Sequence, residues 1–248
     1  MAIFEARQLA KRFGDRIVLE NIDLAFEAGT LTGIMGPNGA GKTTCFNCLT
    51  GMYAPDRGDI LLEGRSIAGL SPPQITRLGV ARSFQAINLF NDDSALDNLV
   101  VALPTMRSRS FDAWRDRARD SEAQQRAASV LAKVGLRGRE HVRARDLAYG
   151  ERRALEIGLA LATQPRILFL DEPTSGLGAN GTARLHELVS ELKRQLTLVI
   201  IEHDMRFLFG LADRINVIHW GQVIARGTPA ELRDNPWIQR SALGALAC

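Results

Sequence analysis

The strongest indication of the fold is the segment Leu31-Thr-Gly-Ile-Met35-Gly36-Pro-Asn-Gly-Ala-Gly-Lys42-Thr43. It begins with an apolar run of strand length and continues with a match to the phosphate-loop pattern G-x-x-x-x-G-K-[ST]. The residues at 43–49 indicate a helix. A strand, a glycine-rich loop and a helix in this order are the context that the pattern requires, so we predict an α/β fold that binds a nucleoside triphosphate.

The chemistry of phosphate binding explains the residue types in this loop. Glycines let consecutive backbone N–H groups turn inward around an anion, and the start of the following helix adds partial positive charge. Lys42 is expected to reach the β- and γ-phosphates, and Thr43 to ligate Mg²⁺. The residues predicted to hold the nucleotide here are Gly36, Pro37, Asn38, Gly39, Ala40, Gly41, Lys42, Thr43 and Thr44.

A pair of carboxylates follows a second apolar segment, at 166–170. The ends of strands beside a phosphate loop are where α/β folds bind their ligands. We expect Asp171 to hold Mg²⁺, directly or through water, and Glu172 to orient and deprotonate an attacking water molecule. A second acid beside the metal ligand favours hydrolysis over transfer to a substrate hydroxyl.

Composition narrows the class of protein. The 248 residues are 46% hydrophobic and 24% charged, which is ordinary for a globular protein. The net charge of +3 gives no argument for nucleic-acid binding. No apolar run approaches the ~20 residues that cross a bilayer, and the N-terminus lacks the apolar segment of a signal peptide. We therefore expect a cytosolic chain whose membrane role depends on a partner.

The three cysteines, Cys45, Cys48 and Cys248, indicate a reducing compartment. Cys45 and Cys48 form a C-x-x-C pattern, for which a redox role is the alternative interpretation. Because the pair lies inside the helix predicted after the phosphate loop, we interpret both as small packed apolar residues.

The distribution of apolar residues predicts one domain with an inserted helical lobe. Strands are predicted at 17–26, 31–35 and 59–62, and the segments 94–103 and 111–134 are predicted to be helical, with a loop at 135–145. Helices at 151–163, 179–195 and 205–211 then alternate with strands at 166–170 and 197–201, and a hairpin pairs 214–219 with 222–226. The predicted division is a core at 1–85 and 148–235, a lobe at about 86–147 and a helical tail at 236–248.

Five further features resemble the ATP-binding cassette family, over nearly the whole chain. Gln85, in Arg-Ser-Phe-Gln, resembles the glutamine that senses Mg²⁺ and the γ-phosphate in that family. His203, in Ile-Glu-His-Asp, resembles its switch histidine, and Phe13 stands where the family stacks an aromatic ring on adenine. The segment at 175–178 occupies the position of the D-loop. The motif that resembles the family signature consists of Leu147, Ala148, Tyr149, Gly150 and Glu151.

This resemblance implies a fold and a set of roles. The fold is a P-loop NTPase with a RecA-like core, an antiparallel β subdomain and an inserted helical lobe. The implied cofactors are ATP and Mg²⁺. Glu172, His203 and Gln85 are the implied catalytic residues, and Thr43, Gln85 and Asp171 the implied metal ligands. The signature residues would contact the nucleotide of an opposing chain, because two cassettes of this family face each other head to tail.

The chain departs from the common family pattern at two places. Ala148 and Tyr149 stand where serine and glycine are usual in the signature, so backbone N–H groups and the helix dipole remain to meet the γ-phosphate. Gly178 stands where the D-loop usually has Asp or Asn. We interpret the first change as a mark of one branch, and the second leaves open a homodimer or a heterodimer with unequal sites.

The motif sequences are similar to those of ATPases that power importers of branched-chain and other hydrophobic amino acids. Importers of urea and short amides, and exporters of lipid or polysaccharide, are the alternatives within the family. A soluble cassette protein of DNA repair or translation would usually carry coiled coils, zinc hooks or tandem cassettes. A P-loop kinase or GTPase would leave the signature stretch unexplained, and the guanine-specific N-K-x-D motif is absent from the sequence.

The expected partners follow from the family. They are a second ATPase subunit, membrane permease subunits and, indirectly, a periplasmic or extracellular solute-binding protein, with no nucleic acid. The expected location is the cytoplasmic side of the cell membrane.

Overall fold

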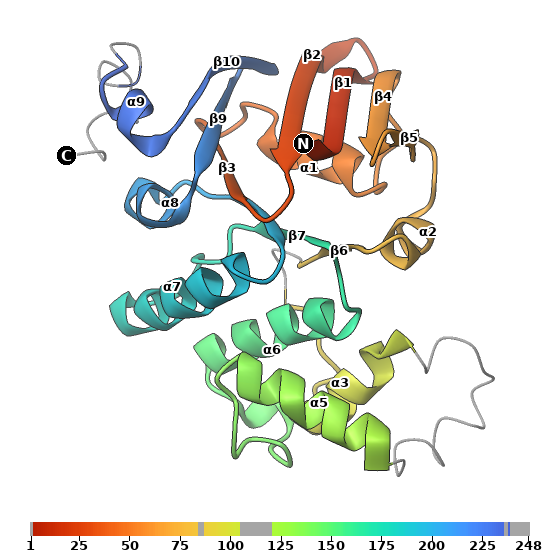
Figure 1. Ribbon diagram of the computed structural model, residues 1–248, viewed down its shortest axis with the longest axis vertical. Coiled ribbons are helices and arrows are strands. Elements are labelled where there is room, and N and C mark those ends of the chain that lie inside the picture. The colour runs from red at the N-terminus through yellow and green to blue at the C-terminus, as the bar shows by residue number, and fades with distance from the viewer. Residues whose placement is uncertain (1, 84–86, 105–120, 236–237, 239–248) are drawn as a thin grey trace.

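Strands with two different burial patterns build two separate sheets in this protein. The computed structural model describes residues 2–83, 87–104, 121–235 and 238. Along β2 (Arg16–Glu27) buried and exposed residues alternate, whereas β7 (Ile167–Asp171) and β8 (Thr197–Ile201) are buried along their whole length. Alternation is typical of a sheet with one solvated face, and continuous burial of a sheet covered on both faces. Figure 1 shows both sheets in one half of the molecule and a group of helices in the other.

The remaining elements have the following bounds. The other strands are β1 (Ala2–Phe13), β3 (Leu31–Met35), β4 (Arg57–Leu62), β5 (Arg65–Ser66), β6 (Val80–Arg82), β9 (Arg214–His219) and β10 (Gln222–Gly227). The helices are α1 (Lys42–Leu49), α2 (Pro72–Arg77), α3 (Ala95–Ala102), α5 (Ser121–Lys133), α6 (Tyr149–Ala162), α7 (Ala179–Lys193), α8 (Met205–Leu211) and α9 (Pro229–Arg233), with a short 3₁₀ helix, η2 (Ala144–Asp146).

The six-stranded sheet has the order β10-β9-β3-β8-β7-β6 and is parallel except for β10. Parallel neighbours need crossover connections, which α7 and α8 supply between β7, β8 and β9. The carboxyl ends of parallel strands meet at one edge of a sheet, and Ile201 of β8 lies opposite both Ile34 and Asp171. This edge is therefore where the phosphate loop and the acidic residues come together.

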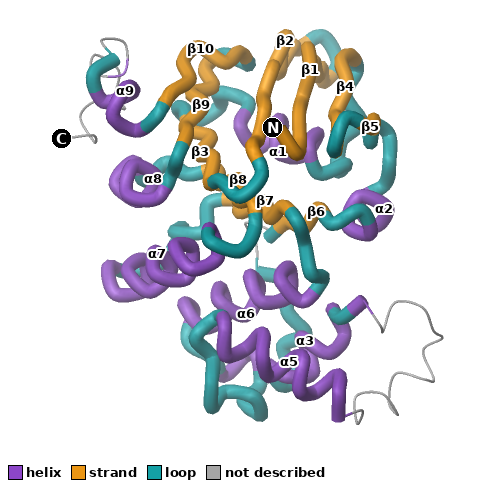
Figure 2. The backbone as a smooth tube through the Cα atoms, viewed as in Figure 1, coloured by secondary structure: helices purple, strands orange, loops and turns teal. Residues whose placement is uncertain are grey.

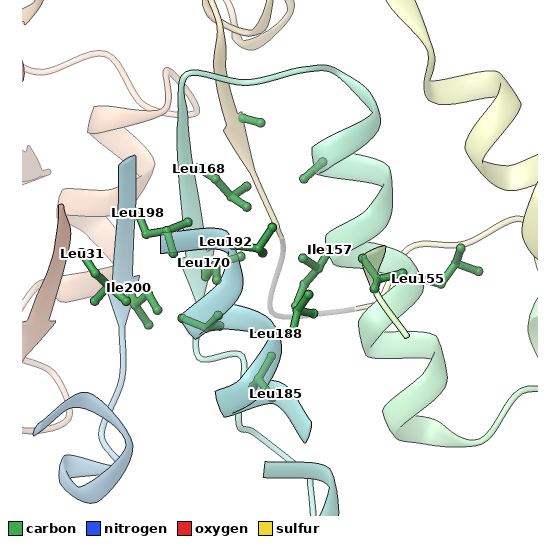
Figure 3. Close-up of a cluster of buried hydrophobic side chains, with 14 of the residues drawn as sticks. Leu31, Leu155, Ile157, Leu168, Leu170, Leu185, Leu188, Leu192, Leu198 and Ile200 are labelled. Carbon is green, nitrogen blue, oxygen red and sulfur yellow. The ribbon is translucent and has the colours of Figure 1, made fainter. Parts of the chain in front are cut away.

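Each face of this sheet contributes to a different hydrophobic cluster. Leu168 and Leu170 belong to the cluster under α6 and α7, whereas Ile167 and Phe169 belong to the cluster around α1. The split follows the two-residue period of a strand, in which successive side chains point to opposite faces. Figure 3 shows Leu168 and Leu170 facing helical side chains such as Leu188.

The four-stranded sheet is antiparallel and has the order β2-β1-β4-β5. Its apolar face packs with α1 against the larger sheet. The Phe169 ring makes edge contacts with Phe4 at 5.3 Å and with Phe46 of α1 at 5.2 Å between centroids. This packing fixes the helix that follows the phosphate loop.

A group of three helices, α3, α5 and α6, forms the other half of the molecule (Figure 2). In α5 the buried residues are Ala123, Ala127 and Leu131, at intervals of four residues. This spacing gives the helix one apolar face, which turns toward its neighbours and leaves the charged residues outside.

The predicted α/β class is confirmed, and several details differ. α6 begins at Tyr149 and not at 151. The 12-residue strand β1 was not given bounds from the sequence, and four short elements, β5, β6, α2 and α9, were not predicted because they carry too few residues for a periodic pattern. Two predicted segments lie partly or largely outside the described residues. They are residues 111–120 of a predicted helix and all of the predicted tail except Ile238. Within the described ranges, no helix is both long and apolar enough to cross a membrane.

Candidate nucleotide site

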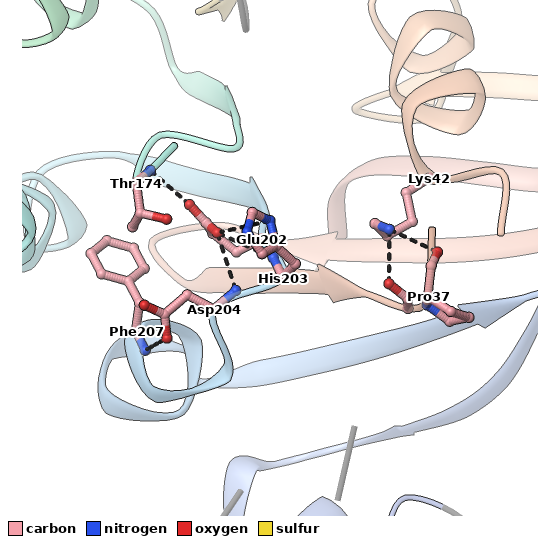
Figure 4. A network of polar contacts seen from close by, with 8 residues as sticks. Pro37, Lys42, Thr174, Glu202, His203, Asp204 and Phe207 are labelled. Carbon is pink, nitrogen blue, oxygen red and sulfur yellow. Dashed lines mark hydrogen bonds and ion pairs between the residues drawn. The ribbon is translucent and has the colours of Figure 1, made fainter. Parts of the chain in front are cut away.

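The phosphate loop between β3 and α1 is closed by its own lysine. Nζ of Lys42 donates hydrogen bonds to the carbonyl oxygens of Gly36, at 2.8 Å, and Pro37, at 3.0 Å (Figure 4). Burial lowers the pKa of Lys42 from its usual value, and the charges of Glu172 and Asp171 act in the opposite direction. Gly39 and Gly41 have φ values of 77° and 99°, a conformation that glycine adopts at little cost.

Neighbouring strands hold this loop from outside. A Cβ atom at Gly36 would lie 2.0 Å from the carbonyl oxygen of Ile218 at the end of β9. The backbone N–H of Gly221, in the turn between β9 and β10, donates to the carbonyl of Ala40 at 3.0 Å. The loop therefore depends on close backbone contacts that a side chain would prevent.

A pocket of about 290 Å³ opens over the loop. Its lining combines the loop with Phe13 and Arg16 from the four-stranded sheet, and with Glu172. The Phe13 side chain is 45% exposed and meets Tyr53 edge-on at 5.4 Å. An exposed aromatic ring on one side and an anion-binding loop on the other fit a purine nucleotide. The lining residues are Phe13, Arg16, Val18, Asn38, Gly39, Ala40, Gly41, Lys42, Thr43, Thr44 and Glu172.

Asp171, at the end of β7, is 2% exposed and forms an ion pair with Arg82. Nη2 of Arg82 lies 2.6 Å from the carboxylate. Nη1 of the same guanidinium donates to Asn47 Oδ1 at 2.6 Å and to Thr50 Oγ1 at 3.0 Å. Arg82 thus connects β7 to α1 and fixes one oxygen of the predicted metal ligand.

Glu172 has a left-handed backbone conformation, with φ of 44°. Its N–H donates to the carbonyl oxygen of Ile201 in the neighbouring strand at 2.9 Å. A non-glycine residue in this region is strained by about 1–3 kcal/mol, and it persists where surrounding contacts determine it. The turn directs the chain away from the sheet edge directly after Asp171.

His203 follows β8, which lies between β3 and β7. Its side chain is 58% exposed. The loop that carries the histidine therefore emerges between two neighbouring strands. One of these, β3, leads to the phosphate loop, and the other, β7, leads to the acidic pair. Gln85, which was predicted to act with these groups, lies outside the described residues.

The signature motif lies at the start of α6, away from the phosphate loop. Glu151 accepts a hydrogen bond from the N–H of Ala148 at 3.0 Å and another from Arg139 Nε at 3.0 Å. The Tyr149 hydroxyl donates to the carbonyl of Ser175 at 3.1 Å. Ala148, Gly150 and Glu151 line a different pocket, of about 490 Å³, between α5, α6 and α7. The chain therefore holds two separate parts of the predicted nucleotide site.

The residues present fit a magnesium ion that is held mainly by nucleotide and water. Within the described residues, no group of three or more His, Cys, Asp or Glu side chains is arranged to hold a metal ion. Mg²⁺ is commonly bound through one or two protein oxygens together with phosphates and water. The exposed hydroxyl of Thr43 and the carboxylate of Asp171 supply such oxygens.

Comparison with known proteins identifies the family. The family model for ABC transporters matches residues 19–175. The chain belongs to this family. The branched-chain amino acid transport ATP-binding proteins LivG of Escherichia coli K12 and BraF of Pseudomonas aeruginosa are 42% and 41% identical to it, with 95% and 98% of each chain covered. The lipopolysaccharide export ATP-binding protein LptB of Acidithiobacillus ferridurans is 32% identical, over 99% of this chain and 96% of its own.

Solved structures agree with the family. The crystal structure of MJ1267, an ATP-binding cassette of an ABC transporter in its ADP conformation, superimposes on this cassette with a TM-score of 0.85. The two are 27% identical, and the match covers 96% of this chain and 97% of the other.

Two residues that hold neighbouring parts of the site in place were not predicted from the sequence. Arg82, whose side chain is 9% exposed, ends β6, and the buried Glu202 follows β8. The only signal in the sequence is a charged residue next to an apolar run. That signal does not reveal Asp171 as the partner of Arg82 or Thr174 as a partner of Glu202, because each lies far away in the sequence.

Proposed function

We propose that this ABC cassette hydrolyses ATP to power a membrane importer of branched-chain amino acids. The observation that carries the ATPase role is one pocket, in which the phosphate loop, an exposed aromatic ring and Glu172 meet. The class of transported solute is inferred from the similarity to LivG and BraF, because the cassette does not itself contact the solute. The lower identity to LptB makes export of a lipid or polysaccharide the less favoured role.

The binding roles follow from the geometry of the pocket. The base of the nucleotide stacks on Phe13, and the phosphates lie in the backbone N–H groups of the loop. Lys42 is held by two loop carbonyls and exchanges them for phosphate oxygens, which stabilise its charge. Thr43 and Asp171, with Gln85, would hold Mg²⁺, which supplies positive charge to the phosphates.

Glu172 and His203 provide the chemistry at the γ-phosphate. Glu172 lines the pocket, and we assign it the role of orienting a water molecule and accepting its proton. His203, on the adjacent loop, donates a hydrogen bond to the charge that develops on the transferred phosphoryl group. Both act at strand ends that the parallel sheet holds side by side.

The separation of the signature from the phosphate loop implies a second cassette. Ala148, Gly150 and Glu151 line a pocket that shares no lining residue with the phosphate-loop pocket. In a head-to-tail pair, the signature of one chain closes the loop of the other. The pair then acts on permease subunits from the cytoplasmic side of the membrane, and a solute-binding protein delivers the substrate.

The substitution Glu172→Gln tests the ATPase role. It retains the size of the side chain and removes the base, so we expect kcat to fall by about 10²–10⁴-fold with unchanged ATP affinity. Glu27→Gln, at the exposed end of β2, is the matched control and should leave both unchanged. Near-normal turnover in Glu172→Gln would show that Glu172 is not the catalytic base.

Reconstitution tests the transported class. The cassette is co-purified with its permease subunits, placed in proteoliposomes with the solute-binding protein, and assayed for ATPase activity with leucine, isoleucine or valine. Stimulation by these amino acids, and not by urea or short amides, is the expected result. Stimulation by a lipid or polysaccharide alone would establish an exporter instead.

A further inference from the structure

Glu202 is a fully buried carboxylate beside the site, and it has no role in the reaction described above. Its exposure is 0%, and it stands between the end of β8 and His203. Figure 4 shows its side chain pointing from the His203 loop toward Thr174, on the loop that follows Glu172. Burying a carboxylate costs free energy unless polar partners compensate.

The two carboxylate oxygens serve two different loops. Oε1 accepts a hydrogen bond from the backbone N–H of Thr174 at 2.7 Å. Oε2 accepts from the N–H groups of His203 at 3.1 Å and Asp204 at 3.3 Å. The same oxygen lies 3.9 Å from Nδ1 of His203. Glu202 therefore bridges the turn of the proposed base and the loop of the proposed phosphate ligand.

The backbone around Glu202 extends this connection to the phosphate loop. The N–H of Glu202 donates to the carbonyl of Ile34, near the end of β3, at 3.3 Å. The N–H of Glu172 donates to Ile201, directly before Glu202, at 2.9 Å. One residue thus lies where the three active loops of the chain meet.

The Glu172 turn depends on contacts of this kind. Glu172 holds a φ of 44°, and its strained backbone needs support on both sides. Ile201 supports its N–H, and Glu202 holds Thr174, two residues further along the turn. Without the second contact the turn can relax, and the Glu172 carboxylate moves relative to the pocket.

We propose that Glu202 is a positioning residue that sets the separation between Glu172 and His203. The inference rests on the proposed roles of those two residues. Glu202 does not line the nucleotide pocket, so it acts through the loops and not on ATP. Displacing a reacting group by about 1 Å can cost about 100-fold in rate, which makes such a bridge relevant to kcat.

The substitution Glu202→Gln tests this role. Glutamine has one oxygen and one NH₂ group, so it can accept from one loop only and places a donor against the N–H groups of the other. We expect kcat to fall by about 10- to 100-fold. Because Phe13 and the phosphate loop are untouched, KM and the affinity for a fluorescent ATP analogue should stay within about twofold.

The matched control is Thr197→Val, at the opposite end of β8. The Thr197 hydroxyl accepts a hydrogen bond from the N–H of Gly29 at 3.0 Å, so this variant also removes a buried acceptor of a backbone N–H. It should lower the melting temperature without lowering kcat. An equal loss of kcat in both variants would reduce Glu202 to a structural role and overturn the proposal.

A double-mutant cycle separates this proposal from the proposed function. If Glu202 acts through Glu172, Glu202→Gln should cause no further loss of kcat in the Glu172→Gln background. An inactive Glu172→Gln combined with normal turnover in Glu202→Gln overturns the role of Glu202 and leaves the ATPase assignment standing. Normal turnover in Glu172→Gln overturns both.

A second variant covers the case in which Glu202→Gln does not fold. Glu202→Asp retains both acceptor oxygens but is one methylene shorter, so it cannot span both loops. The expected result is again a loss of kcat with retained ATP affinity, together with faster hydrogen exchange at the Thr174 amide. Unchanged kcat and unchanged exchange would contradict the bridge.

Discussion

At the scale of single residues, Arg82 supports the predicted metal ligand. Its side chain is 9% exposed, that of Asp171 is 3% exposed, and the two are 2.6 Å apart. The Phe46 ring lies 5.1 Å beneath the guanidinium carbon, which excludes water from that side. The pair therefore holds a charge that would otherwise be buried without compensation.

We expect Arg82→Met to lower the free energy of unfolding by about 3 kcal/mol, because it leaves the Asp171 carboxylate without its buried partner. Chemical denaturation monitored by circular dichroism gives this value. Arg126→Met is the control, because Arg126 pairs with Glu122 on the exposed face of α5. It should change stability by no more than about 0.5 kcal/mol, and equal losses in both variants would contradict the interpretation.

At the scale of elements, the glycines of the strand–loop–helix unit differ in whether they can accept a side chain. We expect Gly36→Ala to prevent stable folding or ATP binding, because its Cβ would lie 2.0 Å from the Ile218 carbonyl oxygen. Gly39→Ala meets no atom within 4 Å and faces only the strain of its φ of 77°. It should fold, with a loss of about 1–3 kcal/mol. The soluble yield and the thermal denaturation of the two variants test this expectation. Equal yields and equal melting temperatures would refute the steric argument.

The helix α1 also determines the reactivity of its cysteines. Both thiols are buried, and burial raises the pKa of Cys45 and raises that of Cys48 to about 11. A thiol reacts as its thiolate, and at pH 8 a group with this pKa is only about one-thousandth ionised. In a Cys248→Ser variant, Ellman's reagent should therefore react slowly with the native protein and quickly after unfolding. Rapid modification of the native chain would support the redox interpretation of the C-x-x-C pattern.

At the scale of the whole molecule, the proposed nucleotide site would be completed by a second chain. We expect Glu172→Gln with ATP and Mg²⁺ to elute as a dimer in size-exclusion chromatography with light scattering, and as a monomer with ADP. Adding Gly150→Asp should abolish the dimer, because it places negative charge where the signature would meet the γ-phosphate. A Cβ at Gly150 comes no closer than 3.7 Å to its neighbours, so the fold should persist.

The control for this experiment is Gly64→Asp in the turn between β4 and β5. A Cβ there meets nothing within 4 Å, and aspartate tolerates the φ of 77° better than most residues do. It adds the same charge away from the signature and should leave the dimer intact. A dimer that survives Gly150→Asp would show that the signature does not close the site.

The sequence predicted several strongly patterned elements well, but it gave no bounds for the 12-residue strand β1. β3, β8 and α8 have the predicted bounds, since each is a compact apolar segment between clear loop signals. β5 and β6 are too short for a periodic pattern, and pairing with neighbouring strands defines them. For the site, the spacing of glycines and acids predicted Lys42, Thr43 and Asp171, while the buried partners of these groups had no local signal.

The phosphate loop, the acidic strand end and the family can be recognised from the sequence alone, because motif spacing and apolar periodicity are local properties of the chain. Which side chains meet follows from the three-dimensional arrangement of the strands and helices. The strand order β3-β8-β7-β6 places Arg82 against Asp171, and Glu202 between Thr174 and His203. It also placed the signature away from its own phosphate loop. These contacts join residues far apart in the chain, so they depend on strand pairing and helix packing, which no short stretch of sequence specifies.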